Sequence, residues 1–444
     1  MNQTFQAGFA QVDITPPLGV CMAGYYERRE ATGIIKPLYA GALALAAGGE
    51  KWVFISCDLI GIDAPYAQSV RELIREQIGL EPRQVLIHCS HTHTGPVITW
   101  EDGAETLGAP DDAYNDMLRR KLADVTRMAL ADLQDTAPSI GFGEEHGVSF
   151  IRRYLMKSGT VMTNPGIGNP DVVAPTGRID PTVSVIELQR AFPHRSVLLV
   201  HFALHCDTVG GTLYSTDYPG YLREAVQRQM PNHEVIFING AAGDINHIDA
   251  MHPGKTGEGS AYTAKIGRIL AGEAIKTAQR LQPFAVDKLQ AELTSLEVPL
   301  RSINPEELAT AQRLIADFSA GRWHYTDMNE VGEIADAYQI DNLSRLGGRM
   351  ALGIQLLTAG DLAIVGVPGE LFVDISRQIQ QKSPFRHTLI ASLSNGSDGY
   401  FPTAEAFQSG GYEAQNNPFT TALEDALVAC VLEMLDQAAS AVRT

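Results

Sequence analysis

Short apolar runs recur along the chain and alternate with amphipathic stretches. The runs are nearly continuous and rich in Val, Ile and Leu, which is typical of strands buried on both faces. They cover residues 42–47, 52–56, 85–88, 183–188, 197–202, 235–238, 351–357, 362–367 and 389–393. Apolar residues at helical spacing predict helices over 64–76, 112–133, 219–229, 261–280, 305–319, 371–380 and 420–438. Strands that alternate with helices predict an α/β architecture.

Two further segments, 141–154 and 288–300, look like longer antiparallel strands or hairpins. We therefore expect a mixed, largely parallel β-sheet core that is flanked by helices. No internal repeat, low-complexity segment or long linker interrupts the sequence. The sequence thus predicts a single continuous domain over residues 1–444.

Charge and composition narrow the classes of partner. The chain has 444 residues, with 34 Lys plus Arg against 52 Asp plus Glu and a formal net charge of −18. This balance argues against a nucleic-acid groove or an anionic membrane surface as partner. No run approaches the roughly 20 apolar residues of a membrane helix, and no signal-peptide pattern opens the sequence. The five scattered cysteines form no CxxC pair, which favours reduced thiols in a cytoplasmic protein.

The first candidate for chemistry follows the apolar run at 85–88. His91-Thr92-His93 comes directly after it, and Gly95 and Pro96 end the extended segment. In an extended chain His91 and His93 point to the same side, and two imidazoles so placed can hold a metal or a substrate. A pair of hydrogen-bonded loop histidines would give the same pattern.

Two other predicted strands also end in polar side chains. One leads to His205, which is a better candidate ligand than His201, a residue we interpret as a core histidine. The next leads into a small-residue turn that carries Asp244, Asn246 and His247. The glycines of this turn let the backbone approach a ligand closely. A tight strand-to-helix turn without any ligand would have the same sequence pattern.

Polar residues that follow several predicted strands indicate a functional site more strongly together than any one of them does alone. Glu370 follows the apolar run at 362–367, and Tyr400 and Tyr412 lie in Gly-rich loop segments. Alone, the glutamate could simply favour a helix dipole, and the tyrosines could cap the core. However, four strand ends now carry His, His, Asp and Glu, and ligand sites in α/β sheets form at strand ends. Two histidines and a carboxylate with an open position are typical of catalytic zinc.

These segments, in this order, resemble the neutral/alkaline ceramidase superfamily. Residues 12–19, 22–25 and 37–40 carry the same resemblance, which extends over essentially the whole chain. The motifs are specific as an ordered set, although no single one is. The resemblance implies one ceramidase-like catalytic domain with the α/β fold of that superfamily, and one Zn²⁺ per chain.

The resemblance also implies roles for individual residues. The zinc ligands of the family fall on His91, His205, Glu370 and Tyr400. His93 would lie beside the reacting group, and Tyr412 would face the substrate carbonyl. An arginine near the substrate would be Arg152, with Arg153 as a further substrate contact.

Two departures from the family pattern bear on the substrate. Ceramidases have a serine implicated in catalysis in a Gly-Asp-x-Ser motif, and here Asn246 stands in that catalytic position. Its amide cannot act as a nucleophile. We also expect neither the C-terminal immunoglobulin-like domain nor the secretion signal of ceramidases. A soluble small molecule with an amide or ester is therefore a better expected substrate than ceramide itself.

The preferred interpretation is a zinc-dependent hydrolase in which metal-activated water cleaves an amide, or an ester. His93 would act as acid and base or orient the water, while Tyr412 and Arg152 would stabilise the oxyanion. Asp58, at the end of the predicted strand 52–56, and Asp244 would orient imidazoles.

Several alternatives stay open. Asn246 and His247 could mark a second metal, with Asp58 and His93 near it, or a different substrate contact. A zinc-assisted lyase, isomerase or glycosidase on a sugar-like substrate is a second alternative, and a non-catalytic binding protein of the same fold is a third. A serine hydrolase is disfavoured because the sequence has no GxSxG motif. The sequence predicts no oligomeric state.

Overall fold

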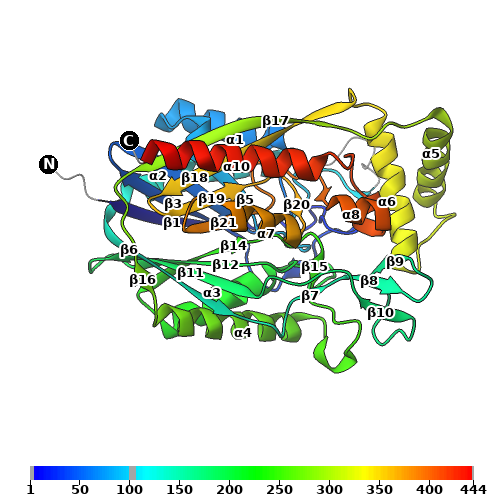
Figure 1. The fold of residues 1–444 in the computed structure, drawn as a ribbon, viewed down its shortest axis with the longest axis horizontal. Coiled ribbons are helices and arrows are strands. Elements are labelled where there is room, and N and C mark those ends of the chain that lie inside the picture. The colour runs from blue at the N-terminus through cyan, green and yellow to red at the C-terminus, as the bar shows by residue number, and fades with distance from the viewer. Residues whose placement is uncertain (1–4, 100–106, 443–444) are drawn as a thin grey trace.

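Two β-sheets pack face to face in the computed structural model, which describes residues 5–99 and 107–442 (Figure 1). The larger sheet has the strand order β14-β12-β11-β6-β1-β3-β4-β5, with β16 paired to β6. Its strands are β1 (Gln6–Asp13), β3 (Tyr39–Ala47), β4 (Glu50–Cys57), β5 (Val85–Cys89), β6 (Gln134–Glu144), β11 (Thr182–Arg190), β12 (Ser196–Phe202), β14 (His233–Asn239) and β16 (Gln282–Pro283). The smaller sheet is formed by β17 (Leu289–Pro299), β18 (Arg349–Ala359), β19 (Leu362–Gly366) and β21 (His387–Ala391).

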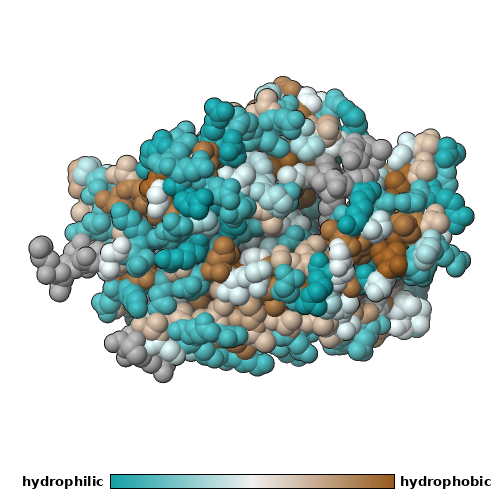
Figure 2. All heavy atoms as spheres, turned by 90° about the horizontal axis from the view of Figure 1, so that it is seen from above, coloured by the Kyte–Doolittle hydropathy of each residue, from teal (hydrophilic) through white to brown (hydrophobic). Residues whose placement is uncertain are grey.

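Helices cover the outer faces of both sheets (Figure 1). The larger sheet is covered by α1 (Ala64–Ile78), α2 (Asp112–Ala131), α3 (Asp217–Gln229) and α4 (Ser260–Ala278). The smaller sheet is covered by α7 (Val373–Lys382) and α10 (Leu423–Val442). At one end of the molecule lie α5 (Pro305–Ser319), α6 (Met328–Leu343), α8 (Ala404–Ser409) and α9 (Tyr412–Gln415). Figure 2 shows a mostly hydrophilic face, with hydrophobic side chains gathered at this same end.

The core follows from the alternation of side chains along buried strands. In β4, Trp52 and Phe54 point between the two sheets, whereas Val53 and Ile55 pack toward α1 and α2. The indole nitrogen of Trp52 donates a hydrogen bond to the carbonyl oxygen of Thr358 at 3.0 Å. Full burial of such a side chain stabilises the fold by roughly 1.5–3 kcal/mol. This interior contact therefore ties the two sheets together.

The prediction of a mixed sheet flanked by helices is confirmed, but the expectation of a largely parallel sheet is corrected. The β4–β5 and β12–β14 pairs are parallel, whereas the five pairs between β12 and β4 in the strand order are antiparallel. Gly48 and Gly49, with φ of 61° and 85°, form the tight turn between β3 and β4. Such a turn can join only antiparallel neighbours, because parallel strands need a long crossover.

Strands that run in opposite directions along the sheet nevertheless meet at their ends. The hydroxyl of Ser56 in β4 donates to the carbonyl of Phe237 in β14 at 2.8 Å. The backbone N–H of Asn239 donates to Nε2 of His88 at 3.0 Å. A right-handed twist of roughly 20–25° per strand, accumulated along the sheet, accounts for this meeting. It brings the segments that follow β5, β12 and β14 to one place.

All seven predicted helices are present, and α5 has the predicted bounds. Helix α6 was not predicted, because its apolar residues are spread around the helix rather than along one face. The long antiparallel strand expected at 288–300 is β17. Among the described residues, no helix has the length and apolar character that would be needed to cross a membrane.

Candidate metal site

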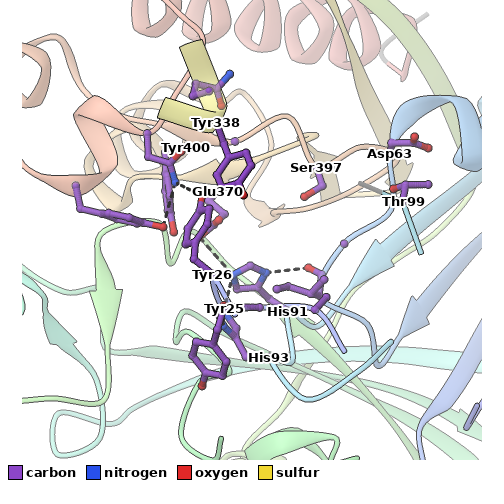
Figure 3. Close-up of a pocket in the computed structure, with 18 residues that line it drawn as sticks. Tyr25, Tyr26, Asp63, His91, His93, Thr99, Tyr338, Glu370, Ser397 and Tyr400 are labelled. Carbon is purple, nitrogen blue, oxygen red and sulfur yellow. Dashed lines mark hydrogen bonds and ion pairs between the residues drawn. The ribbon is translucent and has the colours of Figure 1, made fainter. Parts of the chain in front are cut away.

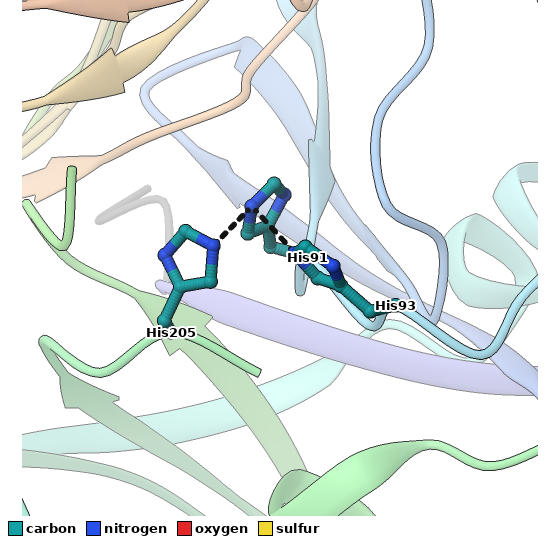
Figure 4. Close-up of side chains that lie close together, drawn as sticks. All are labelled: His91, His93 and His205. Carbon is teal, nitrogen blue, oxygen red and sulfur yellow. Dashed lines mark hydrogen bonds between the residues drawn. The ribbon is translucent and has the colours of Figure 1, made fainter. Parts of the chain in front are cut away.

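Three imidazoles converge where the strands meet (Figure 4). His91 and His93 follow β5, and His205 follows β12. The Nε2 atom of His91 lies 3.0 Å from Nε2 of His205 and 3.3 Å from Nε2 of His93. His91 has a φ of 74°, a left-handed conformation in which histidine is enriched among non-glycine residues. This sharp turn directs its ring toward the other two.

Backbone carbonyls determine which nitrogen of each ring carries the proton. Nδ1 of His91 donates to the carbonyl oxygen of Ile60 at 2.8 Å, and Nδ1 of His93 donates to that of Gly24 at 2.9 Å. Nδ1 of His205 faces the carbonyl of Ala242 at 3.4 Å. Each neutral ring therefore presents a lone pair at Nε2. Three lone pairs that face one another repel, and a shared cation removes that repulsion.

A buried carboxylate completes the set of donors. Glu370 lies in β20 (Glu370–Leu371), which pairs with β22 (Tyr400–Phe401) so that Glu370 is opposite Tyr400. Its Oε2 atom lies 3.4 Å from Nε2 of His91, is buried, and accepts no hydrogen bond from a described residue. Ligands of a tetrahedral zinc at about 2.0–2.1 Å are roughly 3.3 Å apart. The histidines and Glu370 therefore fit a metal ion in chemistry and in spacing.

Electrostatics favour the metal-binding forms of His93, His205 and Glu370, but not that of His91. Burial, together with the charge of His91, lowers the pKa values of His205 and His93. Burial also lowers the pKa of His91, but the carboxylate of Glu370 outweighs it and the net direction is upward. Burial raises the pKa of Glu370, but His91 reverses this and leaves it lowered. Neutral imidazoles and an ionised carboxylate are the species that coordinate metals, so a metal ion would displace the proton that Glu370 favours on His91.

An ion network holds the arginine side of the site. The guanidinium of Arg152 pairs with Glu413 at 2.7 Å and lies over the ring of Tyr400 at 5.3 Å. Arg153 pairs with the second oxygen of Glu413 at 2.9 Å, and the Thr163 hydroxyl donates to that oxygen at 2.7 Å. Glu413 is 0 % exposed. The sequence interpretation missed this residue, and its only signal was its place directly after Tyr412.

These groups open into a cavity of about 310 Å³ (Figure 3). His91, His93, Glu370, Tyr400 and Tyr412 line it. The remaining wall is rich in polar and aromatic side chains, among them Tyr25, Tyr26, Asp63, Thr99, Tyr338, Gln339, Ser397 and Asn416. The unpredicted helix α6 supplies two of them, Tyr338 and Gln339. The cavity can therefore receive a small polar molecule against the donor cluster.

Two of the cavity tyrosines have clear partners. The ring of Tyr412 lies 5.6 Å from that of Tyr400, and its hydroxyl accepts a hydrogen bond from the amide of Asn416 at 3.0 Å. Burial raises the pKa of Tyr412 to about 12, so it keeps its proton. The hydroxyl of Tyr25 donates to Asp207, whose carboxylate lies 3.9 Å from Nδ1 of His93. The Tyr412 hydroxyl is thus a hydrogen-bond donor on the cavity wall.

Two residues that the sequence placed in the site, Arg153 and Asp58, contact other parts of the protein rather than the cavity or an imidazole. Arg153 is buried against Glu413 and Gly410 and does not line the cavity, which corrects its expected role as a substrate contact. Asp58 does not orient an imidazole, because both of its oxygens bind the guanidinium of Arg223, at 3.0 and 2.6 Å. Backbone carbonyls orient the rings in its place.

The turn after β14 is structural in its contacts. Asp244 accepts a hydrogen bond from the backbone N–H of Val373 at 3.0 Å, and its own carbonyl accepts from that of Arg152. The amide of Asn246 donates to Asn164 at 2.7 Å, and the ring of His247 is buried 5.9 Å from that of Tyr262. Neither Asn246 nor His247 lines the cavity. Among the described residues, the one cluster that could hold a metal is that of the three histidines.

Comparison with known proteins relates this arrangement to a solved fold. No protein-family model and no curated protein matches the chain. Neutral ceramidase from Pseudomonas aeruginosa has a TM-score of 0.75 and 20% sequence identity, over 98% of this chain and 74% of that one. A ceramidase complexed with C2 has a TM-score of 0.75 and 19% identity, over 98% of this chain and 75% of that one. The chain therefore has the neutral ceramidase fold, as the sequence resemblance implied.

Proposed function

Taking the shared fold as a premise, we propose that this protein is a zinc-dependent hydrolase. It cleaves an amide bond, or an ester, in a small polar substrate. The observation that carries the proposal is the convergence, at the wall of a cavity, of three imidazole lone pairs and the buried carboxylate of Glu370, whose Oε2 accepts no hydrogen bond from a described residue. His91, His205, Glu370 and Tyr400 would hold one Zn²⁺. When bound, the zinc would polarise the substrate carbonyl and lower the pKa of water.

His93 differs from the other two histidines in ways that suit proton transfer. Its side chain is 12% exposed, against 3% for His205, and it lines the cavity. The carboxylate of Asp207 near Nδ1 would stabilise the charged ring after Nε2 accepts a proton from the attacking water. His93 would then return this proton to the leaving nitrogen.

The arginine side would stabilise the negative charge that develops on the carbonyl oxygen. Tyr412 keeps its proton and can donate it in a hydrogen bond to that oxygen. Arg152 carries a positive charge within reach of Tyr400 and holds that ring in place. Asn246 lies outside the cavity, so no side-chain nucleophile stands in the position of the ceramidase serine. Together with the polar wall, this supports a soluble substrate rather than ceramide.

Product analysis of the zinc-loaded protein tests the proposal. A panel of small N-acyl amides and esters should yield carboxylic acid and amine, or alcohol, in equal amounts. A chelator should abolish the reaction, and added zinc should restore it. Release of a product without uptake of water would instead indicate a lyase, and conversion of a sugar-like compound into an isomer of the same mass would indicate an isomerase.

A tyrosine variant sharpens this test. Tyr412→Phe removes one donor to the oxyanion, so kcat should fall by about 10²- to 10³-fold while zinc content is unchanged. Tyr66→Phe is the matched control, because the Tyr66 hydroxyl donates to the backbone of Asn115 at 2.7 Å and does not line the cavity. A wild-type rate in Tyr412→Phe would remove this residue from the mechanism.

A further inference from the structure

A second carboxylate lines the cavity, apart from the donor cluster. Asp63 precedes helix α1 as its N-cap, and its Oδ1 atom accepts a hydrogen bond from the backbone N–H of Tyr66 at 2.7 Å. Figure 3 draws Asp63, Thr99 and Ser397 on the side of the cavity away from Tyr400. Among the described residues, none donates a hydrogen bond to the second carboxylate oxygen of Asp63, Oδ2.

No cation of the described chain balances this carboxylate. Asp63 is half-buried, and no described lysine or arginine contacts it or lines the cavity. Burial raises the pKa of Asp63, and the hydrogen bond from Tyr66 opposes the rise. The first turn of α1 stabilises this carboxylate through its backbone N–H groups, but among the described residues no full positive charge lies beside it to offset its partial desolvation. A cationic group of a ligand would relieve that cost.

The capping role alone does not require a negative charge. Asn caps helices about as well as Asp, because the capping hydrogen bond needs only a side-chain oxygen. Asp111 caps α2 in the same way, with a bond from the backbone N–H of Tyr114 at 2.8 Å, yet it lies outside the cavity. What distinguishes Asp63 is therefore its place on the cavity wall.

The chain path limits how far Asp63 lies from the reacting centre. The carbonyl of Ile60 holds the ring of His91, and Asp63 is three residues further along the chain. Three residues span at most about 11 Å. Ser397 packs directly against Gly61 between them, since a Cβ there would lie 2.6 Å from the Ser397 hydroxyl. A small molecule can therefore reach the donor cluster and Asp63 at once.

We infer that the substrate carries an ammonium group remote from the scissile bond, and that Asp63 is the specificity-determining residue that binds it. The inference rests on the proposed hydrolase function and gives its substrate class: a small N-acyl compound with a free amine. The hydroxyls of Thr99 and Ser397 would accept further hydrogen bonds from the same ammonium. The donor cluster would meanwhile receive the carbonyl.

Binding of metal-chelating probes tests this without turnover. Two homologous series of straight-chain hydroxamates would be titrated into the zinc-loaded protein by calorimetry, one ending in an ammonium and the other in a hydroxyl. One chain length of the ammonium series should bind best, and Asp63→Asn should weaken it by about 10- to 100-fold, as expected for a lost charge-assisted hydrogen bond. The hydroxyl series should change less than threefold, roughly the scatter between contexts, and Asp111→Asn should change neither series.

Each other outcome overturns the inference in a distinct way. If both series bind and Asp63→Asn weakens neither, the ammonium site is wrong while the metal site stands. If Asp63→Asn weakens the hydroxyl series equally, the residue recognises hydroxyl groups, as a sugar-like substrate would require. If no hydroxamate binds the zinc-loaded wild type, the proposed metal site fails and the inference fails with it.

Discussion

The histidine side of the site, His91, His93 and His205, and its arginine side, Arg152 with Glu413, are held in place by different means. Each histidine ring donates from Nδ1 toward a backbone carbonyl. Arg152 instead depends on the carboxylate of Glu413, which is fully buried and also pairs with Arg153. One side is therefore fixed by the course of the backbone, and the other by a side-chain ion network.

This difference teaches that binding of metal and stability of the fold should be separable. Backbone carbonyls stay in place when a distant side chain is changed, so the donor cluster should survive a loss in the arginine network. The network concentrates two positive charges on one buried carboxylate, and such an arrangement is costly when one partner is removed. Substitutions on the histidine side should therefore lower zinc affinity, whereas substitutions on the arginine side should lower the free energy of unfolding.

The largest expected effect is the loss of metal on the histidine side. His91→Asn removes a donor nitrogen, yet asparagine tolerates the φ of 74° at this position. Zinc affinity should fall by more than the roughly 100-fold typical of residues around the ligands, and activity should be lost. Competition with a chromogenic chelator measures the affinity, and urea unfolding of both metal-free proteins should show similar stability.

A surface histidine supplies the control for that experiment. His146 is exposed and, within the described part of the chain, pairs only with Glu144 at 3.1 Å, so His146→Asn should bind zinc as the wild type does. Full zinc content in His91→Asn would contradict the assignment of the donor cluster.

The second prediction concerns the arginine side. Glu413→Gln leaves two buried guanidinium groups without their carboxylate, so the free energy of unfolding should fall by about 3–5 kcal/mol. Zinc content of the folded protein at saturating zinc should remain at the wild-type level, because three of the four proposed ligands, His91, His205 and Glu370, lie outside this network. Urea unfolding and elemental analysis give the two readouts.

Its matched control is a glutamate in an exposed pair. Glu30 pairs with Arg28 at 2.8 Å on the surface, and Glu30→Gln should leave the free energy of unfolding unchanged within error. If Glu413→Gln lost its zinc while folded, the two sides would be coupled and the comparison would be wrong.

The histidine side was also the part that the sequence predicted best. Buried strands are short apolar runs, and a polar side chain directly after such a run stands out. His91, His93, His205 and Glu370 all follow this pattern, and the structure places them in one cluster. The fold class was predictable for the same reason, since the order of strands and helices is local information.

The remaining features, which are the polar partners and the strand directions, depend on contacts between distant residues. Local sequence patterns do not reveal such contacts. Glu413 lies 260 residues from Arg153, and no spacing rule links them. Asp58 follows a strand as the histidines do, but its partner Arg223 comes from α3, which only the fold brings near. Strand direction was misjudged because tight hairpin turns at Gly48 and Gly49 carry less signal than the runs they join. Long-range polar partners thus decide which candidates belong to the site.

Asp244 contacts the arginine side of the site and gives the last and smallest prediction. It accepts from Val373, and its carbonyl accepts from the backbone of Arg152. Burial raises its pKa from 3.8 to about 7, and the charge of Glu413 adds to the rise. The folded state therefore keeps a proton that the unfolded state loses, so the stability that Asp244 contributes falls as pH rises from about 4 to about 7.

Asp244→Asn should remove this pH dependence, because asparagine stays neutral and can still accept the hydrogen bond from Val373. The unfolding free energy of the variant, minus that of the wild type, should rise by at most about 1.4 kcal/mol per pH unit in that interval. Urea titrations of both proteins across the interval measure the difference, and other buried acids such as Asp217 cancel in it. A flat difference would mean that Asp244 is ionised in the folded protein, and that the arginine side tolerates a further negative charge beside Glu413.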